Sequence, residues 1–540
     1  MAKSDYFKQP SVGPNQAHFA HAPSAEINRS TFDRSHAYKT TFDGGRLIPV
    51  FLDEVLPGDT FKMNSTMFSR MATPLKPVLD NAHMDVHFFF VPNRLIWDNW
   101  TRFMGERKTI DDDITGLTIP TTTMSQASLT TGTLGNYFGL PYRNSGGDLT
   151  VSALPFRAYS LIFDEWYRDE NLRPGYHIAM GDGPDTIWAN ANPQRRGKRH
   201  DYFTSCLPWP QKGSAVEIPI ATNAPVKGIG VGPSGTPAGA VNNAKESDGV
   251  TRNYASTYHP WTANQIYVEE STTQAGFPNI YADLSSATAV TINDLRTAFQ
   301  IQKVLERDAR GGTRYIELVL SHFGVRSDDA RLQRPEFLGG SHSMINVNPV
   351  AATAYVGDTE NAVPQGNLAA YATSLNKCKW EKSFTEHGFV IGIVSTRADL
   401  TYQQGIERHW KRASRYDYYL PALAHLGEQA VLTGEIFANG TAADDTVFGY
   451  QERWAELRYK PSRITGEFAS DQEQSLDIWH YSQQFNSAPT LSASFIDDNP
   501  PFKRTLAVQN EPEFLLDAWF DLKCTRPMPT YSIPGLIDHF

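Results

Sequence analysis

Long hydrophobic runs are missing from the sequence. No stretch approaches the roughly 18 consecutive apolar residues that a membrane-spanning helix requires, and the opening MAKSDYFKQP lacks the apolar centre of a secretory signal peptide. Only three cysteines are present, Cys206, Cys378 and Cys524, and none forms a C-x-x-C pair. Such widely spaced cysteines argue against a disulfide framework and do not supply a zinc site. We therefore expect a soluble, cytoplasmic protein without membrane insertion.

Catalytic motifs are also missing. The sequence has no G-x-x-x-x-G-K-[ST] phosphate loop, no H-E-x-x-H zinc pair and no G-x-S-x-G nucleophile elbow. Residues 230–235 have G-x-G-x-x-G spacing, but the prolines beside them oppose the helix that a dinucleotide site needs, so we interpret them as a loop. The consecutive aspartates 111–113 do not encode the separated carboxylate pair of a glycosidase. We expect no enzymatic activity, no cofactor and no metal.

Positive charge is in deficit. The chain has 49 Lys and Arg against 59 Asp and Glu, which gives a net charge of −10. Nucleic-acid affinity comes largely from cationic contacts to phosphate, so a chain this acidic is expected to be a poor general binder of nucleic acid. A local basic patch remains compatible with this total.

Aromatic residues, glycine and proline are abundant and favour strands and turns over long helices: 30 Phe, 23 Tyr, 11 Trp, 39 Gly and 34 Pro. Alternating patterns predict strands within residues 46–63, 84–91, 387–397, 453–460 and 514–523. In the last of these, the apolar positions from Phe514 to Leu522 share one face, and Asp517, Asp521 and Lys523 share the other.

Two helices are predicted between these strands. The first covers residues 154–172, with Ser152 as its cap and Pro174 at its end. The second covers residues 294–312, with a capping box of Thr291 and Asp294 and a stop at two glycines.

The order of these patterns predicts one mainly β protein, a single jelly-roll β-barrel or sandwich with large loop and helical insertions. We expect four segments along the chain. They are an N-terminal arm at 1–38, the first part of the core with a helical insertion at 39–221, a surface-exposed insertion at 222–290, and the second part of the core with the C-terminal segment at 291–540.

Three clusters could carry binding chemistry. His83, Asp85 and His87 share one strand face, which favours a polar subunit contact over a metal site because spacing supplies no fourth ligand. Two basic clusters combine cations with aromatic rings, a composition found both in single-stranded nucleic-acid sites and in protein interfaces. Their candidate residues are Arg195, Arg196, Lys198 and Arg199 for nucleic acid, and Arg408, Trp410, Arg412 and Arg415 for subunit contacts.

Several long blocks resemble the major capsid protein of microviruses, the small icosahedral single-stranded DNA bacteriophages, and especially the gokushovirus group. These blocks are residues 39–63, 154–174, 198–213, 299–340, 415–437 and 526–540. The resemblance covers nearly the whole chain except residues 222–290 and parts of the N-terminal arm.

This resemblance implies a jelly-roll subunit that assembles through pentamers into a sixty-copy T=1 shell around circular single-stranded DNA. It implies as partners a small basic internal DNA-binding protein, pilot and scaffolding proteins, and a host surface receptor. The chain would reside in the virion, after assembly in the cytoplasm of the host bacterium. Residues 222–290 coincide with the segment that forms a protrusion at the threefold axes in this group.

For that protrusion, Tyr254, Tyr258, Trp261 and Tyr267 are the candidate receptor contacts. The same four rings could instead pack three loops against one another. The rival interpretations of the whole chain are a β-sandwich that binds or cleaves carbohydrate, which a sugar-cleavage assay would reveal, and a monomeric attachment spike, which would form no large assembly.

Overall fold

The structure is a computed structural model. It describes residues 28–107, 116–142, 145–176, 179–188, 191–214, 216, 226–232, 242–247, 249–254, 258–260, 265–268, 279–283, 292–312, 314–326, 328, 333–355, 357 and 363–531. The chain divides into two compact units. One unit combines residues 1–208 with 325–540, and the other is Trp209–Gly324.

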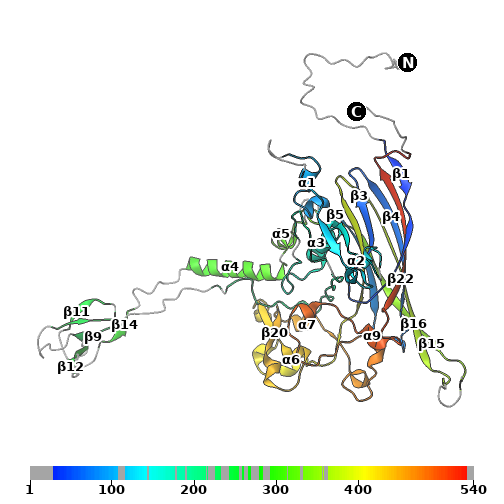
Figure 1. The fold of residues 1–540 in the computed structure, drawn as a ribbon. Coiled ribbons are helices and arrows are strands. Elements are labelled where there is room, and N and C mark those ends of the chain that lie inside the picture. Colours follow the sequence, from blue (N-terminus) through cyan, green and yellow to red (C-terminus); the bar gives the residue numbers. More distant parts are fainter. Residues whose placement is uncertain are drawn as a thin grey trace, which may run out of the picture. The chain divides into compact units, whose positions relative to one another are not determined.

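A nine-stranded antiparallel sheet dominates the first unit (Figure 1). Its strand order is β1-β22-β4-β16-β15-β5-β17-β3, with β2 also paired to β22. The strands are β1 (Ser30–Asp33), β2 (His36–Phe42), β3 (Ile48–Val55), β4 (Thr60–Met71), β5 (Ala82–Pro92), β15 (Glu336–Ala351), β16 (Leu368–Ser383), β17 (Gly388–Ala398) and β22 (Phe514–Arg526).

The sheet curls around one core. Apolar side chains from β3, β4, β5, β16, β17 and β22 belong to the same buried cluster. Phe51 on β3 and Phe520 on β22 lie 5.0 Å apart between ring centroids, although their strands stand near opposite ends of the strand order. The strands therefore form two facing halves, β2-β22-β4-β16 and β15-β5-β17-β3, joined through the β15–β16 pair. This confirms the predicted mainly β, jelly-roll architecture.

A second cluster covers the outer face of the β5-β17-β3 half. Phe89, Ile391 and Ile393 point away from the first core and pack with α3 (Leu154–Ile162). In α3 the buried residues include Phe156, Tyr159 and Ile162, at three-residue spacings that place them on one face of the helix. The predicted helix is confirmed in its first half. Its second half is a π-helical turn, Phe163–Tyr167, after which Arg168 is extended, so the helix ends before Pro174.

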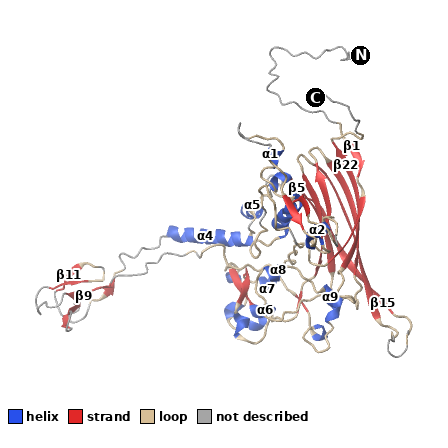
Figure 2. Cartoon of the chain, in the orientation of Figure 1, coloured by secondary structure: helices blue, strands red, loops and turns tan. Residues whose placement is uncertain are grey.

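The remaining elements of the first unit are short, and α6, α7 and α9 lie together at one end of the sheet (Figure 2). They are the paired strands β6 (Thr121–Met124) with β7 (Leu149–Ser152), β18 (Thr401–Tyr402) with β21 (Ser462–Arg463) and β19 (Glu428–Leu432) with β20 (Val447–Glu452), and the helices α1 (Trp100–Phe103), α2 (Leu134–Tyr137), α6 (Thr433–Ile436), α7 (Ala455–Arg458), α8 (Ala493–Ile496) and α9 (Phe502–Thr505).

The second unit contains a five-stranded antiparallel sheet in the order β11-β10-β9-β13-β12. Its elements are β8 (Val226–Lys227), β9 (Ile229–Gly232), β10 (Asn242–Lys245), β11 (Thr251–Tyr254), β12 (Tyr258–Pro260), β13 (Gln265–Val268), β14 (Tyr281–Ala282), α4 (Ile292–Arg310) and α5 (Tyr315–Phe323). The predicted second helix is confirmed as α4, which stops at Gly311 and Gly312; Thr291 lies outside the described residues. The insertion predicted at 222–290 lies inside this unit.

Two sequence-based expectations differ from the structure. Residues 453–460 were predicted as a strand, which is wrong, because the strand β20 ends at Glu452 and Trp454 takes a left-handed φ of 71° that starts α7. Residues 30–38, which we placed in the N-terminal arm, form β1 and the start of β2, while residues 1–27 lie outside the described part. No helix among the described residues is long and apolar enough to cross a membrane.

Candidate functional site: an aromatic and arginine-rich surface

A third, smaller core supports the segment that contains the second basic cluster. Tyr202, Phe203 and Tyr402 pack there with Val431, and the other buried members are Cys206, Ile436, Phe448, Ala455, Phe495 and Ile496. Segments from three distant parts of the chain meet in this core. It fixes the 3₁₀ turn Arg408–Lys411 and helix α7, which carry the charged and aromatic side chains described next.

Glu435 is the buried anchor of this region. Its carboxylate accepts hydrogen bonds from Arg408 at 3.0 Å, from the Tyr202 hydroxyl at 2.8 Å and from the backbone N–H of Leu432 at 3.0 Å. Burial raises the pKa of Glu435 above its ordinary value, while these donors favour the ionised form. Arg408 also donates to the carbonyl of Ala430 at 2.7 Å, so its guanidinium is held in one place.

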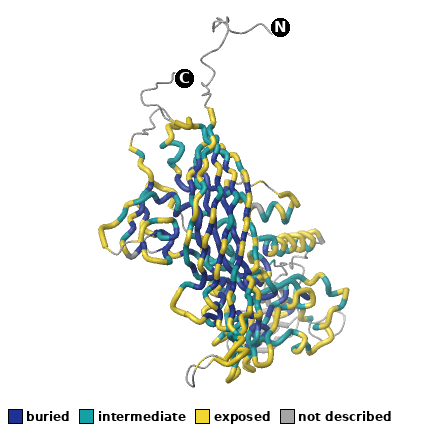
Figure 3. The backbone as a smooth tube through the Cα atoms, turned by 90° about the vertical axis from the view of Figure 1, so that its right-hand side faces the viewer, coloured by how far each residue is buried: buried dark blue, intermediate teal, exposed yellow. Residues whose placement is uncertain are grey.

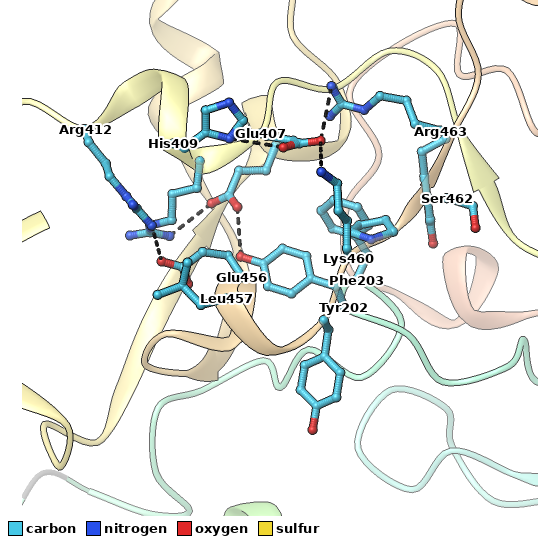
Figure 4. A pocket seen from close by; sticks show the side chains of 16 residues that line it. Tyr202, Phe203, Glu407, His409, Arg412, Glu456, Leu457, Lys460, Ser462 and Arg463 are labelled. Atoms are coloured by element: carbon cyan, nitrogen blue, oxygen red, sulfur yellow. Dashed lines mark hydrogen bonds and ion pairs between the residues drawn. The ribbon is translucent and has the colours of Figure 1, made fainter. Parts of the chain in front are cut away.

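A cavity of about 230 Å³ opens beside this anchor (Figure 4). Tyr202, Phe203 and Tyr402 contribute aromatic surface to its lining. On the rim, Glu407 lies between a histidine ring and two cations. The distances are 3.1 Å to His409, 3.7 Å to Lys460 and 3.8 Å to Arg463.

Exposed aromatic rings belong to the segment 410–419 and to Tyr459, which also lines the cavity. The exposed fractions are 73% for Trp410, 66% for Tyr416, 57% for Tyr459, 55% for Tyr418 and 48% for Tyr419. We call these five rings, together with the exposed Arg415, the aromatic surface. Large exposed apolar patches mark interaction sites, and Trp, Tyr and Arg are the residues that carry most binding energy in protein interfaces.

The structure separates the four predicted subunit-contact residues into two pairs. Arg408 and Arg412 are held inside the chain, since Arg412 pairs with Glu456 at 3.4 Å and lies over the ring of Tyr418. Trp410 and Arg415 are exposed. A partner would therefore meet Trp410 and Arg415, while Arg408 and Arg412 hold the surface in shape. Contact with another subunit stays a prediction for all four.

Asp85 on β5 lies at the centre of a second charged cluster. Arg196 and Arg397 donate to its carboxylate at 2.6 and 2.8 Å, and the His342 ring nitrogen lies 2.5 Å away. Burial alone would raise the pKa of Asp85, but these guanidinium groups and the bond to His342 hold it well below its usual value. Asp85 is only 4% exposed. The expectation that this strand face forms a subunit contact is therefore wrong, because the chain itself covers and neutralises Asp85.

The two neighbouring histidines also find partners within the chain. His87 lies 2.7 Å from the Tyr167 hydroxyl, and His83 lies 3.2 Å from Asp399. Burial lowers the pKa of His87 to about 4, so the ring is neutral near pH 7. Within the described parts of the chain, no group of three or more His, Cys, Asp or Glu side chains is placed to hold a metal ion.

The cations predicted to contact nucleic acid are paired within the chain. Arg196 bonds Asp85, Arg195 donates to Asn499 at 2.7 Å, and Arg199 donates to Asp399 at 2.7 Å. Lys198 is 8% exposed, donates to Gln483 at 2.8 Å and lies over the ring of Phe495. Burial lowers the pKa of Lys198 to about 8. These contacts give the four residues a structural role and do not test their contact with DNA, which stays a prediction.

Comparison with known proteins identifies the chain's family. A family model described as "Capsid protein (F protein)" matches residues 20–536. The chain belongs to this capsid protein family. Three curated relatives, each named "Capsid protein VP1", are similar over nearly their full length. The protein of Bdellovibrio phage phiMH2K is 43% identical over 97% of this chain and 99% of its own, and that of Chlamydia phage 1 is 42% identical over 98% and 99%. The protein of Spiroplasma virus 4 is 37% identical over 94% and 96%.

These relatives confirm that the chain resembles the major capsid protein of microviruses. The chain is therefore a structural capsid protein of the microvirus type. The candidate receptor contacts of the capsid protein lie in its second unit. Tyr254, Tyr258 and Tyr267 are in β11, β12 and β13, and the strand register places Tyr258 opposite Tyr267. Trp261 lies outside the described residues. Receptor contact stays a prediction for all four.

One set of exposed residues in the capsid protein escaped the sequence analysis. On β22 the apolar face was recognised, but Trp519 lies on the opposite, polar face, and Phe68 lies on the outward face of β4, beyond the predicted strand; both are about half exposed. A signal was available, because an aromatic residue at a position that alternation assigns to solvent is unusual.

Proposed function

We propose that this capsid protein is the major shell subunit of a T=1 particle, in which sixty equivalent copies, arranged as pentamers, enclose circular single-stranded DNA. A closed symmetric shell needs each copy to present surfaces that fit its neighbours. The aromatic surface is the observation that carries the proposal, since a member of a capsid family exposes four aromatic rings within residues 410–419 and a fifth at Tyr459. In the shell these rings would be covered by an adjacent copy.

The charge of the chain bears on the packaged genome. At −10 per chain, a shell of such subunits is negative overall and cannot neutralise DNA by its net charge. We therefore propose that a small basic internal protein and cations supply most of the neutralisation, with local cationic patches on the subunit. Pilot and scaffolding proteins complete the proposed set of partners in the host cytoplasm.

Host attachment is proposed for the insertion at 222–290. The five-stranded sheet gives this segment a folded support of its own, and segments held on a folded scaffold are frequent binding sites. Tyr254, Tyr258, Trp261 and Tyr267 are its proposed receptor contacts.

Assembly tests the proposed function. The full-length chain expressed alone should sediment as closed particles of uniform size, visible by negative-stain electron microscopy. Changing Trp410→Ala together with Arg415→Ala should reduce the assembled fraction by at least tenfold, because truncating an interface hot spot costs about 2 kcal/mol or more.

The matched control removes an exposed ring elsewhere. Tyr142→Ala lies outside the aromatic surface, at 55% exposure, and should assemble like the unmodified chain. Equal assembly of the double variant and the control would contradict the assigned contact. A strictly monomeric unmodified chain at high concentration would contradict self-assembly itself.

A further inference from the structure

The two halves of the curled sheet differ in how their outer faces are covered. On the β5-β17-β3 half, outward residues such as Phe89 and Ile391 are buried beneath α3 and its neighbours. On the β2-β22-β4-β16 half, the outward side chains remain exposed. Figure 3 is turned so that this part of the sheet faces the reader, and buried residues alternate along its strands with more exposed ones. We call this the bare sheet face.

Aromatic and apolar side chains lie together on the bare sheet face. Phe68 on β4 is directly opposite Leu375 on β16, and the neighbouring outward residue of β4, Thr66, is opposite Trp519 on β22. The exposed fractions are 46% for Phe68, 56% for Leu375 and 50% for Trp519. Rings at half exposure on the outer face of a sheet can accept a stacked planar group without any rearrangement of the backbone.

The charge of this face is opposite to that of the whole chain. Six cations point outward from its four strands against three carboxylates. The cations are Lys39, Lys62, Arg70, Lys377, Lys379 and Lys523, and the carboxylates are Glu381, Asp517 and Asp521. A fourth carboxylate, Asp33 of the adjoining strand β1, is paired in register with Lys523, so the face carries a surplus of two positive charges, whereas the complete chain carries −10.

Two of the lysines stand directly opposite each other. The register of β22 with β4 pairs Lys523 with Lys62, and both side chains point outward. Like charges in directly opposed positions destabilise a sheet. Lys62 also lies 3.6 Å from Glu381, but both side chains are more than half exposed, and a surface pair of this kind contributes little. The arrangement is favourable once an anion lies between the lysines.

A hollow of about 400 Å³ is present at this position. Lys62, Lys379 and Lys523 line it together with Asn64, Glu381 and Asp521. Three ammonium groups around one hollow can neutralise a phosphate of a passing chain, and Asn64 can donate to its oxygens. The rings of Phe68 and Trp519 lie on the same two strands, further along the face.

We infer that the bare sheet face binds single-stranded nucleic acid, with phosphates at Lys62, Lys379 and Lys523 and bases stacked on Trp519 and Phe68. The inference rests on the proposed function, because it makes this face the inner surface of the shell. Stacking on ring faces and contact to phosphate carry no base code, so binding is independent of sequence. This face differs from the Arg195–Arg199 segment, whose cations are engaged with the chain's own acceptors.

The test uses the full-length chain and a fluorescein-labelled oligothymidine of about 16 nucleotides, followed by fluorescence anisotropy at several salt concentrations. The triple variant Lys62→Gln, Lys379→Gln, Lys523→Gln should bind at least tenfold more weakly and lower the slope of log affinity against log salt by about 2, since each phosphate contact contributes about 0.7 for single strands. Trp519→Ala should weaken binding by about tenfold, and Trp519→Phe should retain most of it.

A control removes the same charge elsewhere. Lys245→Gln, Lys303→Gln, Lys503→Gln changes three other exposed lysines and should leave both affinity and salt slope close to those of the unmodified chain. Thermal unfolding of each variant verifies the fold. The Lys62, Lys379, Lys523 triple variant should melt no lower than the unmodified chain, because it also removes the opposed pair.

Two results would overturn the inference. One is equal DNA binding by the triple variant and the control, which would place the nucleic acid elsewhere. The other is loss of assembly with unchanged DNA binding, which would make the face a protein contact. Sedimentation of the same samples distinguishes a failure of this inference from a failure of the proposed function. If the triple variant forms shells and binds DNA as the unmodified chain does, the inference is wrong and the shell role stands. If the unmodified chain does not assemble, that result counts against the shell role alone.

Discussion

At the scale of single residues, a cation that is bound to a buried carboxylate of the same chain is not available to a partner. Asp85 is nearly inaccessible, and it is stabilised because Arg196 and Arg397 reach it from segments more than 100 residues away in sequence. The basic segment 195–199 was visible in the sequence, but the acceptors that engage it were not, since nothing local indicates which distant residue a side chain will meet. The sequence therefore did not predict that the cations of residues 195–199 are engaged by distant acceptors of the same chain.

Glu513 illustrates the same point and gives a prediction about pH. Its carboxylate is 5% exposed and accepts the backbone N–H of Gly44 at 2.6 Å. Burial, with the nearby charge of Asp43, raises the pKa of Glu513 to about 7. The folded chain thus holds a proton that the unfolded chain loses above its ordinary pKa of about 4.3. Stability contributed by this group is therefore present at low pH and lost as the pH rises from about 4.3 to about 7.

Glu513→Gln should remove this dependence. In urea titrations at pH 5 and pH 8, the variant should lose less stability on going to the higher pH than the unmodified chain, by up to about 3 kcal/mol. The glutamine oxygen can still accept from Gly44, so the fold is retained. Glu511→Gln, at an exposed neighbouring position, should follow the unmodified chain. Parallel curves for all three proteins would show that Glu513 does not titrate in this range.

At the scale of elements, the strands β3, β5, β17 and β22 were predicted, whereas β15, β16 and most of β4 were missed. The pattern of β16 is weak in the sequence because its buried positions include Ser374 and Asn376, which are polar. The alternation in β5 and β22 identified their buried faces, and the outward positions of β22 were also assigned. The strands β9 to β13 have only three or four residues each, too few for a periodic signal, and they were missed. Residues 453–460 show the reverse error, because their alternation is real but a left-handed Trp454 starts a helix there.

Because β8 pairs with β14, residues 228–280 can be replaced by a short turn that joins the two strands. Val226 pairs with Ala282 and Lys227 with Tyr281, so the two ends of the intervening segment are adjacent. Replacing residues 228–280 by Asn-Gly, which favours a two-residue hairpin turn, should leave this pair closed. We predict that the shortened chain still forms shells, while phage carrying it lose adsorption to host cells by at least tenfold.

A matched control keeps the insertion and alters its proposed contacts. Tyr254→Ser with Tyr258→Ser should reduce adsorption while shell yield, measured by sedimentation, is unchanged. If the shortened chain fails to form shells, the insertion is an assembly element. If both proteins adsorb normally, the receptor contact lies outside residues 228–280.

At the scale of the whole molecule, the jelly-roll architecture and the family were predictable from the sequence. Ordered blocks of resemblance extend over almost the entire chain, and the family match at 20–536 agrees with them. The division into Trp209–Gly324 and the remainder was not predictable at its observed limits, because the boundaries depend on which segments pack together. Most of the aromatic surface belongs to the basic and aromatic cluster that the sequence already indicated, whereas the bare sheet face emerged only when distant strands were placed side by side.

The central claim is that this chain builds a closed shell whose bare sheet face lines the interior. Cryo-electron microscopy of particles assembled from the full-length chain tests it most directly. The account predicts a uniform icosahedral shell in which Trp410 is buried between copies, and Lys62, Lys523 and Trp519 face the enclosed space. A shell with these three residues on its outer surface, or a chain that forms no closed particle, would contradict it.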